Sequence, residues 1–93
     1  MTPEKRKIQV VLDKLWVEYS QLYQRVNNLS YFISQNIHLC ADGQERIFLE
    51  NEKTNMSAYH TELLKKQLIA MTEYWVILKE RIDDLSKQFK ECK

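Results

Sequence analysis

Three side chains suited to nucleotide binding recur at intervals of seven residues in the second half of the chain. Gln67, Tyr74 and Arg81 therefore stack along one face of a helix, with roughly 10 Å between neighbours. A guanidinium fork suits phosphate oxygens, an aromatic ring can stack on a purine, and an amide can hydrogen-bond a base edge. Lys66 and Tyr59 lie nearer the N-terminal end of the same helix. We predict these five residues as candidate ligand-binding residues.

The same stripe also supports a structural interpretation. Leu63, Ala70 and Ile77 alternate with the three polar residues along it. Such a mixed stripe is equally typical of an oligomer interface, in which the polar members satisfy one another or fix the register. Both interpretations stay open from the sequence alone.

Catalytic and metal chemistry find little support in the sequence. His38 and His60 are the only histidines, and His38 with Cys40 gives an H-x-C spacing without the further ligands of a zinc site. A single glycine, Gly43, leaves no glycine-rich phosphate loop. We therefore predict a protein that is not an enzyme, with no catalytic residue, no metal site and no cofactor.

Two apolar ladders, one in each half of the chain, must position these side chains. The first consists of Ile8, Leu12, Leu15, Tyr19, Leu22, Val26, Leu29 and Ile33. The second consists of Leu64, Leu68, Met71, Trp75, Leu78, Ile82, Leu85 and Phe89. Both step alternately by four and three residues, which is the 3.5-residue repeat of helices that pack side by side.

The ladders predict an all-α, antiparallel two-helix hairpin that forms a single domain over residues 1–93. The first helix should span about 3–34, starting after Thr2 as its cap, and the second about 57–90, with Ser57 as a cap. The connecting segment, 35–56, contains a turn signal at Asp42-Gly43. We expect a short helix over 44–51 or a loop in this segment.

The helices carry more large apolar side chains than one seam can bury, among them Trp16, Tyr23 and Ile77. Burial is worth about 25 cal/mol per Å² of apolar area, so exposed patches of this size are typical of association surfaces. We therefore predict a homo-oligomeric helical bundle. The alternative is that the connecting segment folds back and covers the excess.

The composition excludes several classes of partner. Fourteen Lys and Arg nearly balance thirteen Asp and Glu, so no overall field attracts DNA or a membrane. The basic residues at the two ends, Lys5-Arg6-Lys7 with Lys87, Lys90 and Lys93, should form one basic end in a hairpin. Two cysteines without framework spacing, no signal peptide and no membrane-length apolar run predict a cytoplasmic protein.

The stretch 62–82 resembles a family of small phage proteins first named from crAss-like bacteriophages. The family pattern LL-x-x-Q-x-x-x-M-x-x-Y-x-x-x-L-x-x-R-I is matched by Leu63, Leu64, Gln67, Met71, Tyr74, Leu78, Arg81 and Ile82. The end of the first helix, 28–33, is similar to the family's other half. The connecting segment looks longer than is usual in that family.

This resemblance implies a helical hairpin similar in architecture to phage anti-defence sponges. Those proteins sequester the cyclic nucleotides with which CBASS and Thoeris systems signal infection. The expected ligand is then a cyclic di- or oligonucleotide or a cyclic ADP-ribose isomer, held at a helix interface in the host cytoplasm. The alternative is a non-catalytic interaction or structural module, such as an adaptor or inhibitor of a host protein.

Overall fold

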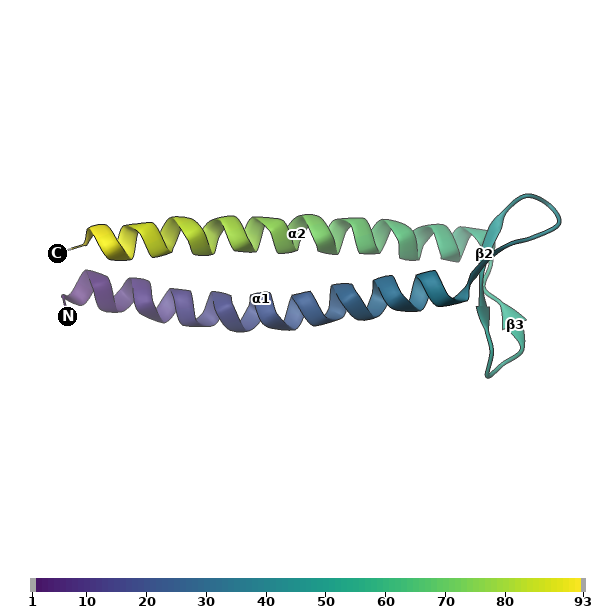
Figure 1. Cartoon of the computed structure of the whole chain (residues 1–93), viewed down its shortest axis with the longest axis horizontal. Helices are drawn as coiled ribbons and strands as arrows, with labels where there is room; N and C mark the ends of the chain where they lie inside the picture. Colours follow the sequence, from purple (N-terminus) through teal and green to yellow (C-terminus); the bar gives the residue numbers. More distant parts are fainter. Residues whose placement is uncertain (1, 93) are drawn as a thin grey trace.

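The chain is an antiparallel helical hairpin with a small sheet at its closed end (Figure 1). The computed structural model describes residues 2–92, and in it α1 (Pro3–Asn36) lies alongside α2 (Ala58–Glu91). The molecule is a rod with extents of 64 × 23 × 16 Å. Both termini lie together at the end opposite the sheet. The predicted two-helix hairpin is confirmed.

Side-chain caps begin both helices where the sequence predicts them. The Thr2 hydroxyl accepts a hydrogen bond from the Lys5 backbone N–H, with Pro3 at the first helical position. The Ser57 hydroxyl accepts from the His60 backbone N–H at 3.0 Å. Each cap satisfies a backbone donor that has no partner within the first turn of a helix. The helices are slightly displaced from the predicted bounds, by about one or two residues at their C-terminal ends.

The two ladders form the seam between α1 and α2, and every ladder residue is buried or half-buried. Leu12, Leu15, Leu22, Leu78 and Ile82 form one buried cluster in it, and Ile33 is also buried. Three contacts between the helices fix their register. Thr2 Oγ1 lies 3.7 Å from Cys92 Sγ, Lys5 Nζ lies 4.7 Å from the centre of the Phe89 ring, and the Tyr19 and Trp75 rings stack at 5.2 Å.

The connecting segment differs from the prediction, because it contains three short strands where we expected a short helix or a loop. Strands β1 (Ile37–Leu39), β2 (Glu45–Leu49) and β3 (Thr54–Asn55) form an antiparallel sheet in the order β1-β2-β3. Ile37 pairs with Ile47, and Leu49 pairs with Thr54. A helix of eight residues is marginal by itself, whereas strand pairing gives hydrogen-bond partners to backbone groups in three parts of the segment.

Two tight turns allow this small sheet to form. The first, between β1 and β2, contains Gly43 with φ +81°, a conformation that glycine adopts without strain. The predicted turn at Asp42-Gly43 is therefore confirmed. The second turn joins β2 to β3 and places Lys53 at φ 51°.

Ile47 and Thr61 attach the sheet to the helices. The Ile47 side chain is completely buried, and β2 contacts both α1 and α2. The Ile47 backbone N–H donates to Thr61 Oγ1 at 3.1 Å, and this hydroxyl donates in turn to the Ser57 carbonyl oxygen at 3.0 Å. The Met56 backbone N–H donates to the Ile47 carbonyl oxygen at 2.7 Å. One buried strand residue is thus held by both its side chain and its backbone.

The connecting segment does not cover the excess apolar surface of the helices. It lies at the end of the rod (Figure 1), and Trp16, Tyr23 and Ile77 remain 44%, 50% and 52% exposed. The predicted alternative in which this segment folds back over them is therefore wrong. Among residues 2–92, neither helix has the length and apolar character that a membrane span requires.

Candidate functional site

The hairpin is a single layer of two helices, so it presents two flanks, one on each side of the seam. The arginine flank carries two heptad-spaced stripes that border each other where Tyr74 bonds Glu18. Its α2 stripe is Leu63, Gln67, Ala70, Tyr74, Ile77 and Arg81. Its α1 stripe is Lys7, Val11, Lys14, Glu18, Gln21 and Arg25.

The tryptophan flank lies on the opposite side of the seam, where Lys79 lies over Trp16. Its α1 stripe is Gln9, Asp13, Trp16, Ser20, Tyr23 and Asn27. Its α2 stripe is Lys65, Ile69, Thr72, Val76, Lys79 and Asp83. All four stripes step by four and three residues, so each keeps a constant direction relative to the seam.

Tyr74 is the residue that links the two helices across the arginine flank. Its phenol donates a hydrogen bond to the Glu18 carboxylate. This bond, assisted by desolvation and by the negative charge of Glu18, raises the pKa of Tyr74, while the positive charge of Arg81 acts in the opposite direction. The phenol therefore remains protonated at neutral pH, and its half-exposed ring is held in place beside Arg81.

The flank around Tyr74 is rich in positive charge. Within the described part of the chain, Arg81 forms no ion pair, and neither do Lys14 and Arg25 on the facing α1 stripe. Gln67 makes one weak contact, from Nε2 to the Met71 sulfur at 3.8 Å. Lys14 and Arg25 were missed by the sequence prediction. Lys14 lies four residues before Glu18 and Arg25 lies seven after it, so the sequence places all three on one face of α1. Only the contact between Tyr74 and Glu18 shows that this face lies beside the α2 stripe of Gln67, Tyr74 and Arg81.

Tyr59 and Lys66 lie away from the other three candidates. Tyr59 is separated from Arg81 by twenty-two residues, or about 33 Å of helix. It lines a hollow of about 600 Å³ at the sheet, together with the carboxylates of Glu45 and Glu62. Lys66 projects about 100° away from Gln67, its neighbour in sequence. The structure thus places Gln67, Tyr74 and Arg81 on one flank, and puts Tyr59 and Lys66 on the outer surface of α2.

An aromatic cluster occupies the middle of the tryptophan flank. The Trp75 ring lies between Tyr19 at 5.2 Å and Tyr23 at 5.5 Å, and Trp16 meets the Tyr19 ring edge-on at 5.6 Å. Lys79 Nζ lies 5.5 Å from the centre of the Trp16 ring. Trp75 Nε1 is buried and donates to no acceptor in the described residues. The sequence prediction counted Trp16 and Tyr23 as excess apolar residues without recognising this cluster.

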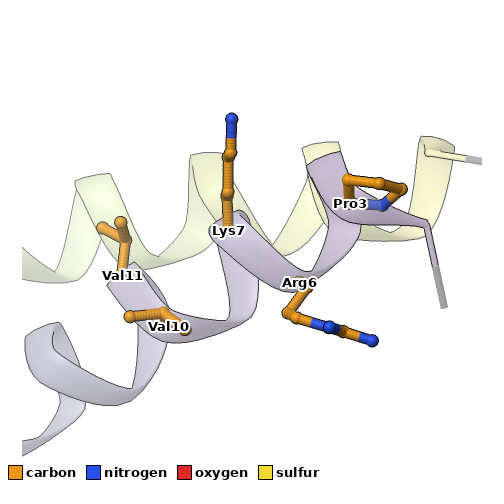
Figure 2. A pocket seen from close by; sticks show the side chains of 5 residues that line it. All are labelled: Pro3, Arg6, Lys7, Val10 and Val11. Carbon is orange, nitrogen blue, oxygen red and sulfur yellow. The ribbon is translucent and has the colours of Figure 1, made fainter.

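A shallow hollow of about 520 Å³ lies on the outer surface of α1 near its N-terminus (Figure 2). Pro3, Val10 and Val11 line it, while the side chains of Arg6 and Lys7 point away from each other. All five residues come from one helix, so no second element closes the hollow. The predicted basic end is formed by both termini, although Lys93 lies outside the described residues.

The shortest ion pair of the closed end joins Asp42, in the turn before β2, to Arg46 in that strand. The Arg46 guanidinium donates to both carboxylate oxygens of Asp42, at 2.9 and 2.7 Å. These bonds, with a further one from the Gln44 backbone, lower the pKa of Asp42 to about 2. Over residues 2–92, no group of three or more His, Cys, Asp or Glu side chains is arranged to hold a metal ion.

Comparison with known protein families identifies a match to this chain. The family model described as Sequestin matches residues 9–84, which include most of α1, the whole sheet and most of α2. The match therefore covers both ladders except Ile8, Leu85 and Phe89, and both flanks of the hairpin except Lys7. No curated protein and no solved structure matches the chain.

Proposed function

The chain belongs to the Sequestin family, and from this we propose that it binds a small molecule and sequesters it without chemical change. The family name indicates sequestration of a partner. The observation that carries the proposal is the arginine flank within the matched region. There a positioned ring and an amide lie on one surface with cationic side chains that form no ion pair within residues 2–92.

The chemistry of this flank suits a cyclic nucleotide. Arg81, with Lys14 and Arg25 on the facing stripe, supplies positive charge for phosphate oxygens. The Tyr74 ring supports stacking of a base, and Gln67 lies one heptad away to hydrogen-bond its edge. Tyr59 and Lys66 contribute only if a second copy of the chain brings them to the same ligand.

We extend the proposal to the biological role that the sequence resemblance implies. The ligand is a cyclic di- or oligonucleotide, or a cyclic ADP-ribose isomer, that CBASS or Thoeris systems use as an immune signal. The protein is then a phage anti-defence sponge, acting as a homo-oligomer in the host cytoplasm. Because it holds the signal rather than cleaving it, it needs no catalytic residue, metal or cofactor.

A thermal-shift panel of cyclic nucleotides tests the ligand class. A bound ligand stabilises the folded state by about 4 kcal/mol when its concentration is 1,000 times the dissociation constant. The ligand that raises the melting temperature should be recovered intact after the protein is denatured, as judged by chromatography. Recovery of a hydrolysed product would overturn the proposal of a non-catalytic sponge.

Arg81→Ala tests the site. Loss of one charge-assisted hydrogen bond to phosphate should weaken binding by about 1.5 to 3 kcal/mol in a calorimetric titration. Arg6→Ala is the matched control, because Arg6 is an exposed arginine of α1 outside the arginine flank. Its affinity should equal that of the unmodified protein. Equal losses in both variants would mean that the ligand senses overall charge instead of this flank.

The alternative function is a protein-interaction or structural module. The large exposed apolar side chains of both flanks favour it, since such surfaces are typical of protein interfaces. In that case no nucleotide of the panel would raise the melting temperature. Arg81→Ala would then change the molecular mass of the assembly instead of ligand affinity.

A further inference from the structure

The aromatic cluster on the tryptophan flank leaves large apolar surfaces unburied. Trp16 and Tyr23 are each about half exposed, although both pack against other rings of the cluster. Ser20 lies between them on the same stripe, four residues from Trp16 and three from Tyr23. Two large side chains on either side of a small one give a surface with two knobs and a hole between them, the shape with which helices pack against each other.

The same α1 stripe of a second copy fits this surface in one orientation. If α1 of another copy lies antiparallel across it with Ser20 at a two-fold axis, the two serines face each other. Each Trp16 then lies near Tyr23 of the partner copy and not against its own equivalent. Asp13 and Asn27 lie seven residues on either side of Ser20, so the axis brings each acid against an amide.

The α2 stripe provides an independent check of this register. The stacked rings of Tyr19 and Trp75 place Ser20 level with Tyr74 on the antiparallel partner helix. Lys65 and Asp83 belong to the tryptophan flank and lie nine residues on either side of Tyr74. The two-fold axis that pairs the serines therefore also places Lys65 of each copy against Asp83 of the other.

We infer that the tryptophan flank is the surface on which a second copy of this chain docks, antiparallel, about a two-fold axis at the level of Ser20 and Tyr74. The second copy adds a second layer of two helices, which covers the exposed tryptophan flank and gives a four-helix bundle. This inference rests on the self-association within the proposed function and not on its ligand.

The existing ion pairs of the flank are compatible with this docking. Lys65 bonds Glu45 at 3.1 Å and Asp83 bonds Lys79 at 3.0 Å, both at exposed positions. Exposed pairs of this kind contribute little stability and can be shared with a new partner. The arginine flank lies on the opposite side of the layer, so docking leaves it open to a ligand.

Cysteine cross-linking tests the position of the axis. In a Cys40→Ser, Cys92→Ser background, Ser20→Cys should form a disulfide-linked dimer under mild oxidation, because residues on the axis face their own copies. Gln21→Cys is the matched control: it is exposed and adjacent, but it projects about 100° away, on the arginine flank. Equal cross-linking of the two variants would overturn the inference. So would no cross-link at Ser20, as expected for a parallel arrangement or a monomer.

Charge reversal tests the register without disturbing the seam. Asp83→Lys should raise the dissociation constant of the dimer roughly tenfold in sedimentation experiments, because the two ion pairs between Lys65 and Asp83 become repulsive. Adding Lys65→Glu to the same chain should restore the dimer. Asp84→Lys makes the same charge change one residue away, off this flank, and should leave the dimer unchanged. Failure of the double variant to restore the dimer would overturn the register.

The two proposals can fail separately. A dimer with these properties that binds no cyclic nucleotide would remove the ligand from the proposed function and leave this interface intact. A ligand-binding monomer would do the opposite.

Discussion

The seam and the closed end of this hairpin are stabilised in different ways. The seam repeats one kind of contact along both helices, and its buried members are all leucine or isoleucine. The closed end depends on single features, namely the buried Ile47, the Thr61 hydroxyl and the Asp42–Arg46 pair. A repeated pattern tolerates local variation, whereas a structure built from single contacts requires each of them.

The comparison also explains how the two regions relate to function. The seam fixes which residues of α1 and α2 lie level with each other, and it thereby assembles both flanks. The closed end sets the direction in which the chain returns, and so makes the helices antiparallel. Variants of the seam and of the closed end should therefore have separable effects on stability.

The largest effect is expected in the seam. Leu78 is fully buried, so Leu78→Ala should lower the free energy of unfolding by roughly 2 to 5 kcal/mol through lost burial and a cavity. Ile77→Ala changes the neighbouring, half-exposed position and should cost only about 0.5 kcal/mol. Urea unfolding followed by circular dichroism measures both. Equal losses would mean that the two ladders do not define the core.

A smaller effect is expected at the junction of the sheet and α2. Thr61→Val keeps the side-chain shape but leaves the buried Ile47 N–H without its acceptor, which should cost about 1 to 3 kcal/mol. Thr72→Val is the matched control. Both threonine hydroxyls donate a hydrogen bond to the carbonyl oxygen four residues earlier, but only the Thr61 hydroxyl also accepts one from a strand residue. Urea unfolding should show that Thr61→Val lowers the free energy of unfolding more than Thr72→Val does. Equal losses would mean that the hydrogen bond from Ile47 to Thr61 does not stabilise the protein.

The smallest effect is expected at the Asp42–Arg46 pair and depends on pH. The pKa of Asp42 is lowered from 3.8 to about 2, so its contribution to stability is present above about pH 4 and is lost as pH falls through 2. The pair is exposed to solvent, which limits its strength. Carboxyl chemical shifts in an NMR titration measure this pKa directly. A midpoint near the ordinary value in the unmodified protein would show that the pair does not form in solution.

Arg46→Gln extends the same test. Removing the guanidinium takes away the main cause of the lowered pKa, so the Asp42 midpoint should move up toward its ordinary value. Lys79→Gln is the matched control, because it removes a cation from the ion pair with Asp83 on α2, which is remote from Asp42 in sequence and fold. The Asp42 midpoint should stay the same in this variant as in the unmodified protein.

The sequence by itself determined the hairpin, because the information for it is local. The 3.5-residue ladders predict two helices and their buried faces, Thr2 and Ser57 mark where the helices begin, and Gly43 marks a turn. Each of these signals lies within one helix or one turn. It also grouped Gln67, Tyr74 and Arg81 on one face, since residues seven apart stack on any helix.

Only the tertiary structure decided the features that require contact between two helices or strands. It pairs β2 with β1 and buries Ile47 between the helices, where the same short segment read alone suggested a helix. The register between α1 and α2 brings Glu18 to Tyr74 and gathers the aromatic cluster, while the length of α2 separates Tyr59 from Arg81. Such relations are set by packing between distant segments, which a pattern along one segment does not contain.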